Sequence, residues 1–488
     1  MLDFFAVLFL TRCKSAGVVA ALAALAGCTS LAPPHAPPDI DLPAAYRGVP
    51  VADTSQPPAA RIAWRDYFTD VRLQALIERA LADNHDLRSA LLRVEEARAA
   101  HGIQRADRGP TIALGASGER TRVPGDLNLT GAPQTASQYQ VGVGFTSWEL
   151  DFWGRVRSLD EAALETYLAT DEARRAAELS LIARIAEDYY RLRELDERLS
   201  LARRTVANRE ESLRIFNRRV EVGAAAALDL KQVEVLLHQA RALDAQLELA
   251  RTQQANALAL LTGSFIEAPF PPERLVDVEA PGAPPPGLPS ELLIHRPDIR
   301  AAEHALRSAN ANIGAARAAF FPRIALTGSA GTASAELDGL FGTGSRAWGF
   351  SPTLSLPIFD GGRRRASLDL AEIRHEQAVV EYERTIQEAF RDVADALAAQ
   401  RWLAEQVEMA QAMLEVQRER ARLADLRYER GAVTFLEVLD AQRDLLEAEQ
   451  QWVQRRRELT SARIALYAAL GGGERYIASA LAPHPHTD

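Results

Sequence analysis

The chain holds two long runs of 68 residues with neither glycine nor proline, and each is followed by one glycine and a further run of 39. They are residues 155–222, Gly223 and 224–262, and then 363–430, Gly431 and 432–470. Because glycine and proline are the residues that most often end helices, the runs predict helices far longer than those of ordinary globular domains. A helix of 68 residues extends about 100 Å, at about 1.5 Å per residue. Such lengths are typical of coiled coils and helical tubes.

A heptad pattern supports this interpretation in the second long run. Thirteen positions recur at strict intervals of three and four residues, and ten of them are aliphatic: Ile386, Ala389, Val393, Ala396, Gln400, Leu403, Val407, Ala410, Leu414, Gln417, Ala421, Ala424 and Tyr428. A sustained period of 3.5 residues predicts helices that supercoil with a left hand.

The two halves of the chain are copies of one unit. Landmarks in the first half recur at almost constant offsets in the second: Asp86 and Pro110 match Asp298 and Pro322 at 212 positions, and Gly154, Gly223 and Gly263 match Gly362, Gly431 and Gly471 at 208. An offset this constant indicates an internal duplication.

Each half also predicts two amphipathic strands. Apolar residues alternate with small or polar ones in four segments: 110–123, 137–150, 322–331 and 346–359. Period-two alternation predicts strands with one apolar face, and each run approaches the length that crosses a bilayer. Four strands cannot close a barrel, so we expect copies to assemble: two would supply eight strands, and three would supply twelve. Twelve leave a lumen where eight do not, so a pore favours the trimer.

The amino terminus predicts export and lipid attachment. The only cysteines are Cys13 and Cys28, so a disulfide framework is excluded for the body of the chain. The segment before Cys28, "RCKSAGVVAALAALAG", has the layout of a signal peptide, and Leu25-Ala26-Gly27-Cys28 resembles a bacterial lipobox. We therefore expect an N-acyl diglyceride and a palmitate on Cys28 and no other cofactor.

Composition excludes several classes of function. The net charge of −10 argues against a nucleic-acid partner. No phosphate loop, nucleophile elbow or zinc-spaced histidine cluster is present, so we expect neither an enzyme nor a metal site, and the terminal "HPHTD" is typical of a disordered tail.

The predicted organisation follows from these segments. It comprises a signal peptide (1–27), a lipidated extended segment (28–68), repeat 1 (69–263), a proline-rich linker (264–288), repeat 2 (289–473) and a disordered tail (474–488).

Three stretches resemble a known family. They are "SWELDFWGRVRS" (147–158), "LPSELLIHRPDIRAAEHALRSANANIGAARAAFFPRIALTGSAG" (288–331) and "YERGAVTFLEVLDAQRDLL" (428–446), and they are similar to TolC-type outer membrane efflux channels of the lipoprotein branch (NodT-like, OprM-like). The resemblance implies an α+β membrane protein, a homotrimer in which the duplicated strand-pair and long-helix repeat forms a twelve-stranded β-barrel continued by a twelve-helix periplasmic α-barrel.

The resemblance also implies a function. The chain would be the outer membrane channel of a tripartite system, lipid-anchored and extending into the periplasm, with a periplasmic membrane-fusion adaptor and an inner-membrane RND pump as partners. It would conduct drugs or other small molecules passively. Protein export by a type I secretion system is the alternative within the channel class, and a lipid-anchored scaffold is the alternative outside it.

The resemblance places a gate at the glycines. Gly223 and Gly431 would be the turns at the periplasmic tip, Tyr428 would hydrogen-bond Asp229 to hold the tip closed, and Glu437 and Asp440 would form acidic rings. The sequence departs from the family at Val433, where an Arg or Asp is common, so we expect Val433 and Phe435 to form an apolar constriction instead.

Simpler readings remain open for several of these residues. Acids at Asp229 and Glu437 also suit the first turn of a helix, and Tyr428 also continues the heptad pattern. Arg218, Arg219, Arg427 and Arg430 favour solvated helix faces, with gate salt bridges as the alternative.

Overall fold

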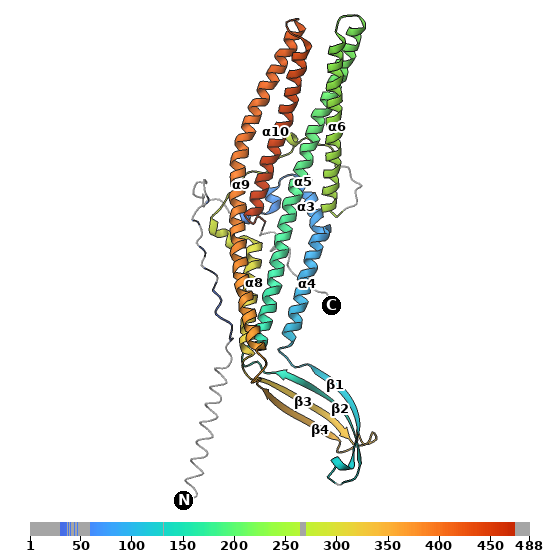
Figure 1. Ribbon diagram of the computed structural model, residues 1–488, viewed down its shortest axis with the longest axis vertical. Coiled ribbons are helices and arrows are strands. Elements are labelled where there is room, and N and C mark those ends of the chain that lie inside the picture. The colour runs from blue at the N-terminus through green and yellow to red at the C-terminus, as the bar shows by residue number, and fades with distance from the viewer. Residues whose placement is uncertain are drawn as a thin grey trace. The chain divides into compact units, whose positions relative to one another are not determined.

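The computed structural model describes residues 30–36, 38, 40, 43, 46, 59–129, 131–263 and 270–473. The predicted signal peptide, the lipidation site Cys28 and the predicted tail at 474–488 lie outside the described residues. Figure 1 labels the helices and strands. The described residues divide into two compact units: unit 1 takes those within Met1–Asp39, Arg93–Thr170 and Ala301–Glu383, and unit 2 takes those within Ile40–Leu92, Asp171–Arg300 and Arg384–Asp488.

Unit 1 contains a four-stranded antiparallel sheet in the order β1-β2-β3-β4. The strands are β1 (Ile112–Val123), β2 (Gln134–Glu149), β3 (Arg323–Ser334) and β4 (Arg346–Ser355). All four predicted strands are confirmed in position, although β4 ends before Pro357, which has no N–H to donate to a neighbouring strand. Because β2 of the first repeat pairs with β3 of the second, the sheet joins the two copies of the duplicated unit.

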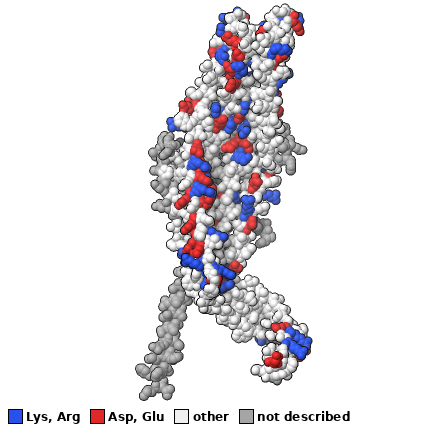
Figure 2. All heavy atoms as spheres, in the orientation of Figure 1, with Lys and Arg blue, Asp and Glu red and all other residues white. Residues whose placement is uncertain are grey.

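The sheet presents apolar side chains outward. Large hydrophobic residues such as Leu114, Trp348 and Phe350 are mostly exposed. On the face drawn in Figure 2, charged residues are sparse over the sheet except near its ends, whereas they stripe the helices. A soluble surface rarely carries so large an apolar patch, so this face must meet a partner or a lipid environment.

Long helices make up most of the remaining chain. They are α5 (Arg155–Glu221), α6 (Ala227–Leu261), α9 (Arg363–Glu429) and α10 (Phe435–Ala469), accompanied by the shorter α2 (Trp64–Tyr67), α3 (Val71–Asp83), α4 (His85–Ala106), α7 (Leu292–His295) and α8 (Pro297–Ala318). Helices α5 and α9 are each 67 residues long, which confirms the two long runs. Helices α6 and α10 have 35 residues each and begin later than their 39-residue runs, because the residues after each glycine form a turn. In the described part of the chain, no helix is both long enough and apolar enough to cross a membrane.

The heptad positions of α9 are buried toward both ends of the helix and half-buried in its middle. Ile386, Ala389 and Val393 are buried, and so are Leu414 and Ala424 nearer the end of the helix. Toward that end, Ala421 and Ala424 pack with Val438 and Ala441 of α10, so alanines meet where the two helices approach each other.

The main core of unit 2 gathers distant parts of the sequence. Trp64, Tyr67 and Phe68 pack against α3, α5, α6 and α10 in one apolar cluster. The rings of Tyr67 and Tyr467 are stacked with their centroids 4.2 Å apart. Residues before the first repeat are thereby attached to the last helix of the second.

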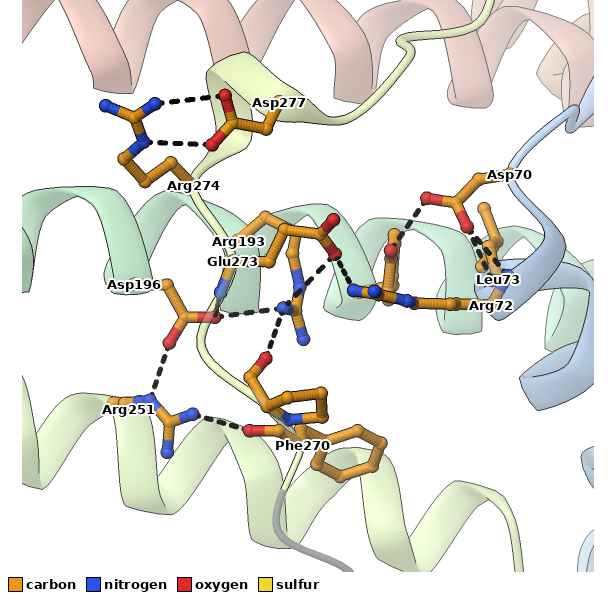
Figure 3. Close-up of polar contacts among 12 residues, drawn as sticks. Asp70, Arg72, Leu73, Arg193, Asp196, Arg251, Phe270, Glu273, Arg274 and Asp277 are labelled. Carbon is orange, nitrogen blue, oxygen red and sulfur yellow. Dashed lines mark hydrogen bonds and ion pairs between the residues drawn. The ribbon is translucent and has the colours of Figure 1, made fainter.

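A polar cluster fastens the segment that begins at Phe270 to α5 and α6 (Figure 3). Arg193 is nearly fully buried, donates to the carbonyl of Pro271 at 2.8 Å and pairs with Asp196 at 3.2 Å. Arg251 of α6 pairs with the other oxygen of Asp196 at 2.6 Å and donates to the carbonyl of Phe270 at 2.8 Å. Because the Asp196 carboxylate and the backbone carbonyls of Pro271 and Phe270 bond these two arginines, the connecting segment is held in one place.

Candidate gating site

The ends of the helix hairpins α5–α6 and α9–α10 form two equivalent glycine turns. Gly223 and Gly431 have φ angles of 76° and 72°, in the left-handed region. The glycine N–H bonds the carbonyl three residues earlier, at 3.0 Å in the first turn and 2.8 Å in the second, and the next N–H bonds the carbonyl five residues earlier. This is the Schellman motif, in which glycine ends a helix without the steric cost of a Cβ atom.

Asp229 lies in the first turn of α6 and caps that helix. Its Oδ2 atom accepts a hydrogen bond from the backbone N–H of Ala226 at 3.3 Å. The described hydrogen bonds do not include one from Tyr428 to Asp229, so in this structure Asp229 makes the simpler contact of a helix-terminal acid. Its role in gating stays a prediction.

Tyr428 contacts an arginine of the other hairpin instead. Its hydroxyl accepts a hydrogen bond from Nη1 of Arg219, near the end of α5. The Arg219 guanidinium also lies over the rings of Phe216 and Tyr428, 5.5 and 5.6 Å from their centroids. A cation over an aromatic face is attracted by the ring quadrupole, so these contacts join the α5 and α9 ends.

Phe435 occupies the centre of this group. Its ring lies 4.5 Å from Phe216 and 5.0 Å from Tyr428, measured between centroids. Within one chain the Phe435 side chain therefore packs between the hairpins, while Val433 is half-buried beside it in the turn. An apolar constriction formed by these two residues stays a prediction.

The two candidate acidic rings carry arginine partners. Glu437 pairs with Arg427 at 2.8 Å, and Asp440 pairs with Arg443 at 3.2 Å. These pairs are well exposed, so the arginines screen the carboxylates without removing their charge. Arg427 is thus in a salt bridge at the candidate gate, whereas Arg218 pairs with Glu221 on an exposed face at 2.9 Å.

Sequence reasoning missed a partly buried polar relay between the hairpins. Arg209 of α5 donates to Oε1 of Gln442 in α10 at 2.9 Å, and Nε2 of Gln442 donates to Oδ1 of Asp425 in α9 at 3.3 Å. Comparison of the repeats could have pointed to it, since position 417, which matches Arg209 at the 208-residue offset, is a glutamine. The duplication therefore does not extend to these residues.

No group of histidine, cysteine, aspartate and glutamate among the described residues is arranged to hold a metal ion. The candidate site consists instead of aromatic, ion-paired and amide side chains between two hairpins. Contacts of this kind hold or release helices and do not by themselves transform a substrate.

Comparison with known sequences gives consistent matches over most of the chain. The sequence profile of the family described as "Outer membrane efflux protein" matches residues 76–264 and 288–472. Outer membrane protein OprJ of Pseudomonas aeruginosa is 46% identical over 474 residues, covering 94% of this chain and 96% of OprJ. The solvent efflux pump outer membrane protein SrpC of Pseudomonas putida is 45% identical over 409 residues, covering 84% of this chain and 87% of SrpC.

A solved structure matches the whole architecture. The open state of the Neisseria gonorrhoeae MtrE outer membrane channel superposes with a TM-score of 0.83 at 40% sequence identity. The match covers 91% of this chain and 99% of MtrE. The fold of this chain is therefore that of a mostly helical outer membrane channel.

Proposed function

Because the chain belongs to the outer membrane efflux protein family and is the outer membrane channel of a tripartite efflux system, we propose that three copies form one conduit for small molecules. Each copy would supply four strands and four long helices. The trimer would then have a twelve-stranded β-barrel and a tube of twelve helices. The observation that carries this proposal is a pair of exposed heptad stripes on α6 and α9.

These stripes recur at strict intervals of seven residues. On α9 they are Trp402, Met409, Val416 and Leu423, and on α6 they are Leu228, Val235, Ala242 and Leu249, all exposed in a single chain. A seven-residue apolar repeat is the signature of a helix that packs against another helix. Since the buried heptad of α9 already packs inside the chain, the exposed stripes suit α6 of one copy against α9 of the next.

The sheet supports the same assembly. Strand β1 pairs with β2 alone and β4 with β3 alone among the described strands, so one edge of each outer strand lacks a partner. An unpaired edge is too costly in lipid, where no water can satisfy its N–H and carbonyl groups. Joining β4 of one copy to β1 of the next removes every edge, and twelve strands leave room for a lumen.

The amino terminus would add a lipid anchor at the sheet end of the helices. The described residues that follow Cys28 contact other parts of unit 1. The Pro33 carbonyl accepts a hydrogen bond from Asn310 at 2.9 Å, and the hydroxyl oxygens of Ser30 and Ser158, near the start of α5, are 3.5 Å apart. Because α5 begins shortly after β2 ends, an acyl diglyceride on Cys28 would enter the membrane leaflet next to that end of the sheet. The helices would then extend into the periplasm.

The tip would be the gate and the docking end. A periplasmic adaptor and an RND pump would engage the hairpin ends, and the pump would supply drugs or solvents, as the name of SrpC indicates for that relative. Glu437 and Asp440 of three copies would form two acidic rings that favour cations. Tyr428, at the end of α9, and Asp229, in the first turn of α6, would help to hold the tip closed.

The assembly is tested by placing a charge on one exposed stripe. Val416→Glu would bury a carboxylate in each of three interfaces, at a cost of several kcal/mol per trimer. Gln411→Glu adds the same charge on the opposite face of α9 and serves as the control. We expect light scattering of the detergent-purified proteins to give monomers for Val416→Glu and trimers for the control. Trimers for both variants would contradict the proposed seam.

Conduction is tested on the purified trimer in planar lipid bilayers. A double change of Asp229→Ala and Tyr428→Phe weakens the closed tip and should raise the current. In that background, Glu437→Gln with Asp440→Asn should lower the preference for cations over anions. If trimers pass no current even with the tip weakened, the channel function is wrong.

A further inference from the structure

Helix α5 contacts the α9–α10 hairpin through a row of arginines. Three of their four partners in that hairpin are neutral, although arginine usually pairs with a carboxylate when it is buried. The contacts are Arg198 Nε to Gln450 Oε1 at 2.6 Å, Arg204 Nη2 to Glu449 Oε1 at 2.9 Å, Arg209 Nη1 to Gln442 Oε1 at 2.9 Å, and Arg219 Nη1 to the Tyr428 hydroxyl. Arg198 also pairs with Glu194 of its own helix at 3.0 Å. All of these residues belong to unit 2.

Arg209 is the most deeply buried of the four. It is 3% exposed, and within the described chain it forms no ion pair. Asp425 attracts it from beyond ion-pair distance, with the Gln442 amide between them. Burial lowers the pKa of the Arg209 guanidinium below its usual value, which reflects the cost of removing its charge from water. The packed arrangement of the hairpins therefore contains an incompletely compensated cation.

Separating the hairpins would return this cation to water. A buried charge whose strongest contact is a neutral amide loses more hydration energy than the hydrogen bond restores. Moving α10 away from α5 exposes Arg209 and relieves that penalty. Arg209 thus favours the separated arrangement.

A second group, closer to the turns, favours the packed arrangement. Phe216 is 4% exposed and packs with Val233 of α6 and Leu439 of α10 in one apolar cluster. Its contact with Phe435, the contact of Phe435 with Tyr428, and the bond from Arg219 to Tyr428 all cross between the hairpins. Separation would expose these rings to water. We call Phe216, Arg219, Tyr428 and Phe435 the aromatic latch.

We propose that the buried Arg209 shifts the tip toward opening by destabilising the packed hairpins. The aromatic latch opposes this effect and holds the hairpins together. The inference rests on the proposed function, since it names what regulates the same gate. Each group has a member on α5 that differs between the repeats: Arg209 matches Gln417, and Phe216 matches Ala424, whereas Arg219 of the latch matches Arg427. Arg209 and Phe216 both lie on α5, in the first repeat, about two helical turns apart. Substitutions at Arg209 and at Phe216 should therefore change the separated population of the hairpins in opposite directions.

The experiment measures hairpin separation and current on the same variants of the full-length protein. Spin labels at Asn217→Cys and Glu429→Cys, both exposed, report the distance between the α5 and α9 ends without requiring conduction. Arg209→Met keeps the length of the side chain and removes its charge, so the separated population should fall by about fivefold or more. Arg219→Gln and Phe216→Ala weaken the latch and should raise that population.

Two further variants keep the test independent of folding defects. Gln442→Glu combined with Asp425→Asn conserves total charge but moves the carboxylate next to Arg209, so it should close the tip as Arg209→Met does. Arg214→Met removes an arginine of α5 whose side chain is 72% exposed and pairs with Glu211 of the same helix, and it should leave the distance distribution unchanged. Thermal melting monitored by circular dichroism checks that each variant is folded.

The outcomes separate the inference from the proposed function. If Arg209→Met and the carboxylate exchange leave the separated population equal to that of Arg214→Met, or increase it, the proposed bias toward opening is wrong. If the distances shift as expected but no variant conducts in bilayers, the inference about the hairpins holds and the proposed conduit fails.

Discussion

Three glycines with left-handed backbone angles, Gly223, Gly431 and Gly263, lie in two different kinds of surroundings. Gly223 and Gly431 end the long helices in open space, where a Cβ atom would meet nothing within 4 Å. Gly263, with a φ of 66°, lies against α3, where a Cβ atom would come within 2.4 Å of the Asp83 carbonyl oxygen. The same residue type thus serves as a helix end at the tip and as a close-packing site in the core of unit 2.

This difference predicts unequal effects of alanine. Gly223→Ala adds only the strain of a left-handed residue, about 1–2 kcal/mol, and should lower the thermal unfolding midpoint slightly. Gly263→Ala adds the same strain and a backbone collision, so it should lower the midpoint much further. Circular dichroism melts of the two purified variants check this, and equal shifts would show that the α3 contact does not constrain Gly263.

Polar side chains at the tip show how contacts depend on neighbouring helices. Asp229 bonds the backbone of its own helix, and Tyr428 bonds Arg219 of another. Arginines that a charge pattern alone places on solvated faces have three different roles in the structure. Arg218 pairs on an exposed face, Arg427 pairs with Glu437, and Arg219 joins the hairpins.

At the scale of elements, the core of unit 2 is rich in buried tyrosines. Tyr67, Tyr189, Tyr190 and Tyr467 each donate a hydrogen bond through the hydroxyl, to backbone carbonyls or to Asp70. Burial raises the pKa of all four hydroxyls well above the ordinary value. The folded state therefore resists their ionisation.

This predicts a loss of stability at high pH. A raised folded-state pKa leaves stability unchanged below the unfolded-state pKa of about 10 and reduces it as the pH rises further, because the unfolded chain releases protons first. In an ultraviolet titration these four of the ten tyrosines should ionise only together with loss of helicity. Ionisation of all ten near pH 10 with full helicity retained would contradict the buried arrangement.

The long helices combine two heptad faces on one element. On α9 the inner face, which includes Ile386 and Leu414, is buried within the chain, and the outer face, which includes Met409 and Val416, is exposed. An isolated helix of this length with two apolar faces would aggregate or pack on other helices. The element thus requires more neighbours than one chain supplies.

At the scale of the whole molecule, the proposed lipid anchor and the sheet would be two separate means of holding the protein in the membrane. The sheet exposes apolar residues such as Ile112 and Phe350. An anchor with several acyl chains would hold the protein stably, and a closed barrel stays inserted without any lipid attached. The barrel alone would therefore suffice for retention, and the lipid would add to it.

Cys28→Ser should accordingly abolish lipid attachment and leave the protein in the outer membrane fraction. Mass spectrometry of the purified protein measures the attached lipid, and sucrose-gradient fractionation measures location. The wild-type protein is the control for both. Recovery of the variant in the soluble periplasmic fraction would show that insertion depends on the lipid.

The sequence by itself determined the elements and their order. Uninterrupted runs without glycine and proline gave the lengths of α5 and α9, and period-two alternation gave the four strands. The constant offset of 208 gave the paired turns at Gly223 and Gly431. These features depend on the local conformational preferences of the chain, which are encoded within one helical turn or one strand.

Only the tertiary structure decided which side chains meet. A heptad pattern identifies the face that α9 turns inward, but it does not fix the register of α10 against α5, because any shift by one heptad preserves the pattern. That register places Gln442 beside Arg209 and Phe435 beside Phe216. The buried cation and the aromatic latch arise from contacts between segments more than 200 residues apart in the sequence, so no local pattern could predict them.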